Sequence, residues 1–159
     1  MHITARVDHA VRILLEIARA QPNSVKAETI ASAQEISPKI LESIAAQLRR
    51  ADLVVSRRGP DGGYRLARPA EQISVADVIR AVEGPLASVR GQRPEDVEYS
   101  GVAAPLQRVW IALRVNIRAV LEEVSIADIA GDELRDFIAD LVSDPGAWTR
   151  RPVPPAAEV

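Results

Sequence analysis

The chain has 159 residues, a hydrophobic fraction of 47% and no cysteine. These values predict one ordinary domain with a real core, with room for an added dimerisation arm. The lack of cysteine excludes a disulfide framework, a thiolate metal site and a cysteine-ligated iron–sulfur cluster. The N-terminus lacks the parts of a signal peptide, and no apolar run is long enough to cross a bilayer. We therefore expect a cytoplasmic protein with no membrane partner.

The net charge of −2 hides a difference between the two parts of the chain. Residues 1–68 carry 11 Lys/Arg against 7 Asp/Glu, whereas residues 69–159 carry 9 against 15. A basic N-terminal module joined to an acidic C-terminal one is typical of a nucleic-acid-binding domain with an appendage that does not touch nucleic acid. Many solvated surfaces have a similar imbalance, so the residue patterns must carry the argument.

Two helices are predicted before residue 36. Apolar residues recur at helical spacing from Thr4 to Ala20, and Gln21 to Ser24 ends that helix. Its predicted inner face holds Val7, Ala10, Val11, Leu14, Leu15 and Ala18. A short second helix covers residues 27–33, and residues 34–36 form a turn. This spacing is typical of a helix-turn-helix.

The next helix, residues 37–51, has a strong start signal because Ser37 can cap it and Pro38 takes its first position. One face is apolar and comprises Ile40, Leu41, Ile44, Ala45 and Leu48. The opposite face carries Lys39, Glu42, Ser43, Ala46 and Arg50. Charged, small and hydroxyl side chains on one helix face suit contact with base edges in a major groove.

A tight β-hairpin follows. Residues 53–57 and 64–67 have strand composition, and the glycine-rich segment 59–63 between them is a turn signal. Arg57 and Arg58 stand next to the turn. A helix followed by a hairpin with arginines near its tip predicts a winged helix-turn-helix. The fold class is therefore mainly α with a small β-hairpin wing, extended by a long dimerisation helix.

That long helix is predicted over residues 105–124, after a helix that starts at a Ser74-x-x-Asp77 cap and ends at Gly84. Apolar residues there are spaced 4, 3, 4, 3, 4, which is the a/d pattern of a coiled coil. They are Leu106, Trp110, Leu113, Ile117, Val120 and Val124. A homodimer contact is one interpretation, and a helix packed inside its own subunit is the other.

The C-terminal part contains weaker signals. Ser125 and Asp128 repeat the cap over a short helix ending at Gly131, and residues 132–142 form an amphipathic helix. Its predicted inward residues are Leu134, Phe137, Ile138 and Leu141. We divide the chain into a DNA-binding domain (1–84), a loop (85–104), a dimerisation and C-terminal helical region (105–144) and a disordered tail (145–159).

Several segments together resemble the Rrf-two type family of bacterial winged helix-turn-helix transcriptional regulators. They are TARVDHAVRILLEIA, IASAQEISPKILESIAAQLRRADLV, SRRGPDGGYRLARPAEQISVADVIRAVEG and the later VW…L…SIADI. The resemblance covers residues 1–130 and implies a winged-helix homodimer with a long crossing dimerisation helix. Many members carry three cysteines between the helix after the wing and the long helix, where residues 86–104 have none. The resemblance thus implies a cysteine-free member.

The resemblance implies that Arg58, before the Gly-Pro turn, enters a minor groove, where the potential is most negative. The alternative is a solvated arginine. The remaining candidates for DNA contact are Ser37, Pro38, Lys39, Glu42, Ser43, Arg50, Arg57, Gly59, Gly62, Gly63 and Tyr64. Ser37 is as easily a helix cap as a base contact, and the glycines serve backbone geometry first.

No metal or enzyme site is predicted. His2 and His9 are seven residues apart and, even with Asp8, make a poor metal site. The chain has no cysteine nucleophile, no G-x-S-x-G, no phosphate loop and no H-E-x-x-H. We predict a homodimeric DNA-binding repressor that recognises a palindromic operator without a cofactor or cluster. The alternatives are a regulator controlled by a small molecule or protein near residues 86–104, and a winged-helix module that binds protein.

Overall fold

The computed structural model describes residues 2–59 and 62–150. The helices are α1 (Ala5–Ala20), α2 (Ala27–Gln34), α3 (Pro38–Arg50), α4 (Val75–Glu83), α5 (Leu106–Leu121), α6 (Ile126–Ala130) and α7 (Asp136–Ser143). The strands are β1 (Val54–Arg57) and β2 (Gly63–Leu66), which form an antiparallel hairpin. The mainly α fold with a small hairpin wing is confirmed.

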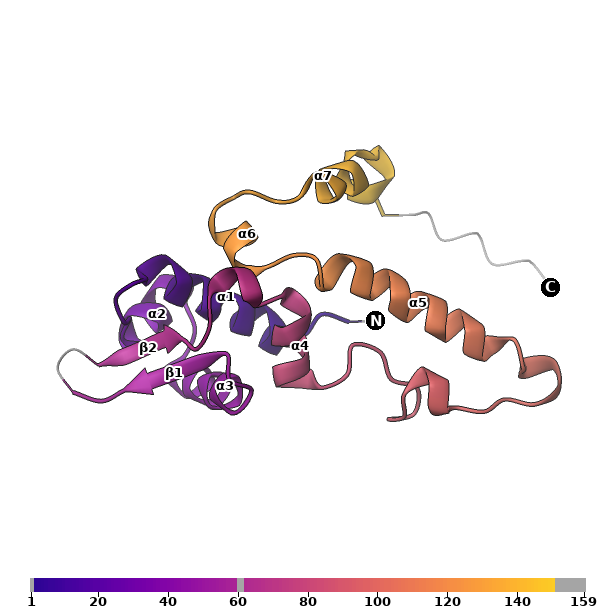
Figure 1. Ribbon diagram of the computed structural model, residues 1–159, viewed down its shortest axis with the longest axis horizontal. Coiled ribbons are helices and arrows are strands. Elements are labelled where there is room, and N and C mark those ends of the chain that lie inside the picture. Colours follow the sequence, from indigo (N-terminus) through magenta and orange to yellow (C-terminus); the bar gives the residue numbers. More distant parts are fainter. Residues whose placement is uncertain (1, 60–61, 151–159) are drawn as a thin grey trace.

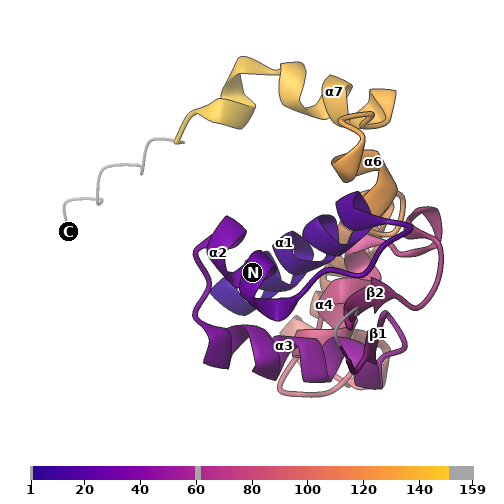
Figure 2. The same cartoon turned by 90° about the vertical axis from the view of Figure 1, so that its left-hand side faces the viewer.

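Helix α1 lies at the centre of the body and contacts α2, α3, α4, α6 and β2 (Figures 1 and 2). Ile13, Leu14 and Ile17 are fully buried. The predicted inner face omitted Ile13 and Ile17 and included Val11 and Leu15, which are only partly buried. The prediction was too narrow because it assumed a helix with one covered side, whereas elements pack around α1 from several directions.

The start of α3 follows its sequence signal closely. The Ser37 hydroxyl accepts a hydrogen bond from the Ile40 backbone N–H at 3.3 Å, and Pro38 occupies the first turn. The predicted apolar stripe is buried at Leu41, Ile44, Ala45 and Leu48. Ile40 is an exception and is 44% exposed, because it stands at the margin of the stripe in the first turn.

Strand β2 of the hairpin is paired on both of its edges. Within the hairpin, Val54 pairs with Leu66 and Arg57 pairs with Gly63. Tyr64 in β2 also exchanges two backbone hydrogen bonds with Val25, at 2.8 and 3.1 Å. The second strand is therefore held by β1 and by the segment that precedes α2.

The serine caps of α4 and α6, Ser74 and Ser125, lie next to each other in an antiparallel backbone bridge. Ser74 and Ser125 begin α4 and α6 with full capping boxes, as predicted. The backbone N–H of Ser125 donates to Asp128 and lowers the pKa of that carboxyl group. Val75 N–H donates to the carbonyl of Val124 at 2.9 Å, and Ile126 N–H donates to that of Ile73 at 2.8 Å.

This junction places α6 against α1, with Ile126 fully buried in the main core. The body therefore includes residues far beyond the predicted domain boundary at 84. The sequence pattern could not indicate this, because five residues are too short to show a reliable helical period.

Helix α5 extends away from the body on the side opposite the wing, and α7 stands apart from both (Figure 1). Helix α7 starts at Asp136, later than predicted, and buries no residue. Leu134 and Leu141 are exposed and Phe137 and Ile138 are half-buried, so the predicted inward face is wrong within this chain. Its main packing partner is the 3-10 turn Pro145–Trp148, part of the predicted tail; residues 151–159 lie outside the described residues.

Replacing Ile126 with alanine tests whether α6 is part of the core. We expect Ile126→Ala to lower the free energy of unfolding by about 2–5 kcal/mol, because the removed atoms leave a cavity beside α1. Urea unfolding followed by circular dichroism measures this. Ile129→Ala is the control, since Ile129 lies on the same helix but is only half-buried. Equal losses for both variants would contradict the core position of Ile126.

Candidate nucleic-acid interface

The outer face of α3 presents the side chains that a major-groove contact requires. Lys39, Glu42, Ser43 and Arg50 are all exposed, as is Pro38 at the helix start. None of these four polar side chains takes part in an ion pair with another described residue. The face therefore remains available to bases and phosphates, while Ser37 uses its oxygen as the helix cap.

Helix α3 is braced against its neighbours by polar contacts near its C-terminal end. Arg49 donates to the hydroxyl of Ser56 in β1 at 3.0 Å. Arg6 in α1 donates to the side chain of Gln47 at 2.6 Å. The first contact links α3 to the wing and the second links α3 to α1. A protein that contacts two adjacent DNA grooves needs these elements in a fixed relative orientation.

Arg57 and Arg58 are both exposed near the tip of the wing. Gly59 has a φ of +110°, and its carbonyl accepts from the Gly62 N–H at 2.9 Å. Pro60 and Asp61, the rest of the predicted turn, lie outside the described residues. Arg58 thus stands where the hairpin begins to turn, with its guanidinium unpaired by the described carboxylates.

The glycines at the end of the turn are required by close backbone packing. A Cβ on Gly63 would lie 2.5 Å from the carbonyl oxygen of Val25. A Cβ on Gly62 would overlap the carbonyl oxygen of Arg57. Tyr64, the next residue, is half-buried against the core. The structural part of the sequence interpretation is therefore confirmed for these residues, and a DNA contact by them stays a prediction.

One feature of this surface was missed from the sequence. A groove of about 480 Å³ lies between the wing and residues 22–26, and Lys26, Arg57 and Arg65 line it. No carboxylate belongs to its described lining. Arg65 follows Tyr64 on β2, so strand alternation places it on the solvent face and could have indicated it. Only the tertiary packing brings Lys26 beside it.

The predicted seam on α5 is divided between two environments. Ile117 and Val124 are buried within the chain, and Trp110 and Leu106 are half-buried. Trp110 donates to the hydroxyl of Tyr99 at 3.1 Å. For Ile117 and Val124 the intrasubunit interpretation applies, whereas a dimer contact by Leu106 and Trp110 stays a prediction. Leu113 is exposed and Val120 is half-buried, so their part in a dimer contact stays a prediction.

The segment before α5 packs against that helix along a defined path. Pro94 and Val97 are buried, and 3-10 turns occupy Pro94–Asp96 and Gly101–Ala103. Gln107 donates to the Val97 carbonyl at 2.8 Å. Helix α5 of the same chain therefore supplies the packing surface for this segment.

Comparison with known proteins identifies the family. Residues 3–132 match the family described as "Rrf2: Iron-dependent Transcriptional regulator". This chain is a member of the Rrf2 family. An HTH-type transcriptional regulator of Mycobacterium tuberculosis is 46% identical over 145 residues, which are 91% of this chain and 90% of the relative. IscR of Cereibacter sphaeroides is 33% identical and the match covers 85% of this chain and 90% of that protein.

Solved structures agree with that assignment of the Rrf2 fold. CymR, the global cysteine regulator of B. subtilis, has a TM-score of 0.69 at 29% identity, covering 82% of this chain and 97% of CymR. IscR of T. potens has a TM-score of 0.64 at 25% identity, covering 96% and 94%. The chain is thus a winged helix-turn-helix transcriptional regulator with a DNA-binding fold, and these relatives are named as regulators.

The iron in the family description does not fit the donors of this Rrf2 member. The whole sequence has no cysteine, and the segment where relatives carry cysteines offers only Glu95, Asp96 and Glu98 as charged oxygen donors. Carboxylates alone do not provide the soft ligands of an iron–sulfur cluster. Among the described residues no group of three His, Asp or Glu is placed to hold a metal, and no described helix is long and apolar enough to cross a membrane.

Gly63 provides a test of the wing anchor. We expect Gly63→Ala to lower the free energy of unfolding by about 1–3 kcal/mol, because its Cβ would overlap the Val25 carbonyl at a positive φ. Thermal and urea unfolding measure the change. Gly131→Ala is the control, since its nearest neighbour would be 3.3 Å away and its φ is negative. A Gly63→Ala variant as stable as the parent would disprove the close contact.

Proposed function

We propose that this Rrf2 protein is a homodimeric repressor that binds a palindromic operator. The observation that supports this most is that exposed cationic and hydroxyl side chains lie on α3, on the wing and at residue 26. Helix α5 extends from the side of the body opposite the wing (Figure 1). A DNA-binding surface needs such a concentration of positive charge, although the whole chain has a net charge of −2.

In this proposal α3 enters the major groove. Lys39 lies in its first turn, and Glu42 and Ser43 follow on the next turn of the same face. Lysine can donate to guanine, glutamate can accept from the amino group of cytosine, and serine can contact either kind of base edge. Arg50, at the helix end, and Arg57 on β1 are better placed for phosphates, which fix position and do not select sequence.

The wing reaches the adjacent minor groove through Arg58. A guanidinium there gains most where an A·T-rich sequence narrows the groove, because the negative potential is strongest in a narrow groove. Lys26 and Arg65 flank the wing from the other side and contribute phosphate contacts. Sequence selectivity then has two sources, direct contact by α3 and groove shape at the wing.

Dimerisation uses the face of α5 that is not covered by its own chain. Val109, Leu113, Asn116 and Val120 recur at spacings of 4, 3 and 4 on that face. Val109 and Leu113 are exposed, in contrast to Ile117 on the covered side. The three apolar side chains of this set would bury each other across a two-fold axis, with Asn116 as a polar position among them. A dimer would present two α3 helices to two half-sites.

The sensing chemistry of this protein differs from that of an iron–sulfur regulator. We expect neither a cluster nor thiol oxidation to control it, since both require cysteine. A winged helix that binds protein is the alternative function, and the three cations lining the groove beside the wing favour DNA. Genome-wide selection of bound fragments with the purified protein tests the choice. An enriched palindrome supports the proposal, and no enrichment over random DNA would reject it.

Arg58 is the residue expected to matter most for operator affinity. Arg58→Ala should weaken binding to the selected operator by about 1–3 kcal/mol, because it removes the charge in the minor groove. Fluorescence anisotropy at fixed salt measures this. Arg108→Ala removes the same charge from an exposed position on α5 and should have little effect. If both variants bind like the parent, the minor-groove role of Arg58 is incorrect.

Leu113 tests the dimer face. Leu113→Asp should convert the dimer into folded monomer, since a carboxylate would lose its hydration in an apolar contact. Leu113 is 43% exposed in the protomer, so the substitution leaves the fold intact. Val115→Asp is the control, because Val115 is 57% exposed on another face of α5. Sedimentation velocity distinguishes the states, and a parent that is monomeric at micromolar concentration would refute the interface.

A further inference from the structure

A cleft lies between α5 and the segment that follows α4, far from the wing. One end of it is a hollow of about 410 Å³ whose lining includes Arg80, Arg93, Arg114 and Arg118 and one carboxylate, Glu95. The other end is a hollow of about 420 Å³. Leu86 and Ala87 line both hollows, so the two ends are adjacent.

The second hollow is mainly apolar. Its walls include Leu86, Val89, Pro94, Trp110 and Ile117. Trp110 is half-buried and its ring nitrogen is already bonded to Tyr99, which fixes the orientation of the indole. A pre-formed apolar hollow with an aromatic wall beside a few charged groups is the usual form of a small-molecule site.

The charge of the first hollow favours a single negative charge. The four arginines are opposed by Glu95, which pairs with Arg114, and by Glu122 and Asp77, which pair with Arg80 from outside the lining. Because Asp77 also pairs with Arg68, at least one positive charge of the hollow is left without a carboxylate of its own. Arg93 forms no ion pair within 4.0 Å with a described residue, and Arg114 Nε lacks an acceptor among the described atoms.

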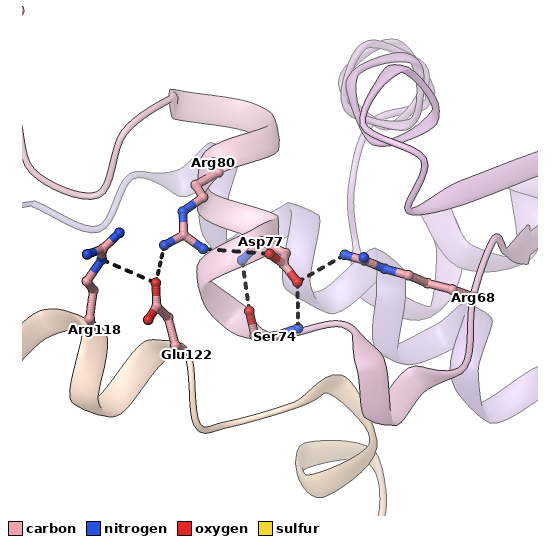
Figure 3. A network of polar contacts seen from close by, with 6 residues as sticks. All are labelled: Arg68, Ser74, Asp77, Arg80, Arg118 and Glu122. Atoms are coloured by element: carbon pink, nitrogen blue, oxygen red, sulfur yellow. Dashed lines mark hydrogen bonds and ion pairs between the residues drawn. The ribbon is translucent and has the colours of Figure 1, made fainter.

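A series of ion pairs runs from the basic end of the cleft to Arg68, which lies just after the second strand of the wing (Figure 3). Arg118 contacts Glu122 at 3.3 Å, and Glu122 also contacts Arg80. Arg80 lies 3.6 Å from Asp77, which in turn accepts from Arg68 at 3.0 Å.

The last two residues of this series of ion pairs lie next to structural elements of the DNA-binding body. Arg68 follows the last residue of β2 by two positions, and Asp77 is part of the cap of α4. A change at the cleft therefore has a continuous set of polar contacts through which to reach the base of the wing.

We propose that this cleft binds a small organic carboxylate with an apolar or aromatic body, and that the bound ligand weakens operator binding. Arg93 and Arg118 hold the acid group, while Trp110 and Ile117 contact the apolar part. The acid group competes with Glu122 for Arg118 and Arg80, which disturbs the pairing of Asp77 with Arg68. Only the effect of the ligand on operator binding rests on the proposed DNA-binding function. The binding of the ligand to the cleft does not depend on it.

Ligand binding is tested first, without DNA. The probes are phenylacetate, 4-phenylbutyrate and octanoate, and the neutral control is 4-phenylbutanamide. Trp148→Phe leaves Trp110 as the only tryptophan, so quenching of its fluorescence reports the cleft. We expect saturable binding of at least one carboxylate and at least about tenfold weaker binding of the amide, because a charge-assisted hydrogen bond to arginine is lost.

Matched variants locate the site. Arg118→Gln should weaken binding of the carboxylate about tenfold and leave the amide unchanged. Arg108→Gln removes the same charge from the same helix outside the cleft and should bind like the parent. Failure of all three carboxylates to saturate below about 5 mM, or equal binding of acid and amide, would overturn the proposal.

Coupling is tested by operator anisotropy with and without the tightest probe. We expect the probe to weaken operator binding by about fivefold or more. Glu122→Gln should keep probe binding but lose this response, whereas Glu123→Gln, whose partner is Arg135, should respond like the parent. Probe binding with unchanged operator affinity rejects the coupling alone. A parent that never binds an operator rejects the DNA-binding function and leaves the cleft result standing.

Discussion

The packing around α1 is the constraint on which the rest of the structure depends. Ile13, Leu14 and Ile17 lie fully buried between helices that come from both ends of the described chain. Burial on several sides makes α1 a shared core for the DNA-binding helices and for α6. Helix α3 packs directly on α1, whereas α5 leaves the body against α4, which itself packs on α1.

The wing shows how that constraint reaches the proposed functional surface. Its second strand pairs with β1 on one edge and with Val25 on the other, and Gly63 is needed for the second contact. Arg49 links α3 to the first strand through Ser56. A hairpin of four-residue strands would be marginal in isolation, and these contacts make it a fixed extension of the body.

The absence of cysteine leaves the segment before α5 without thiolate ligands, but not without structure. Pro94 and Val97 are buried, and Glu95 and Tyr99 pair with Arg114 and Trp110 on α5. The cleft beside this segment is lined by guanidinium groups and apolar side chains. Such a lining suits an organic anion, whereas a cluster would need soft ligands.

The sequence by itself determined the local elements and the family. Ser37, Pro38 and the two Ser-x-x-Asp caps marked helix starts that the structure confirms, because capping depends on residues within one turn. The glycine-rich hairpin was equally clear. The absence of cysteine, with what it means for clusters and thiols, was also readable directly.

Only the tertiary structure decided which faces are covered and which distant groups meet. A heptad pattern does not say whether Ile117 faces its own chain or a partner, and the burial of Ile126 depends on the contact of α6 with α1, near the other end of the chain. The same holds for Lys26 beside Arg65, and for Arg118 linked to Arg68. Periodicity is a property of neighbours along the chain, whereas burial and charge pairing arise from contacts between segments that the sequence separates.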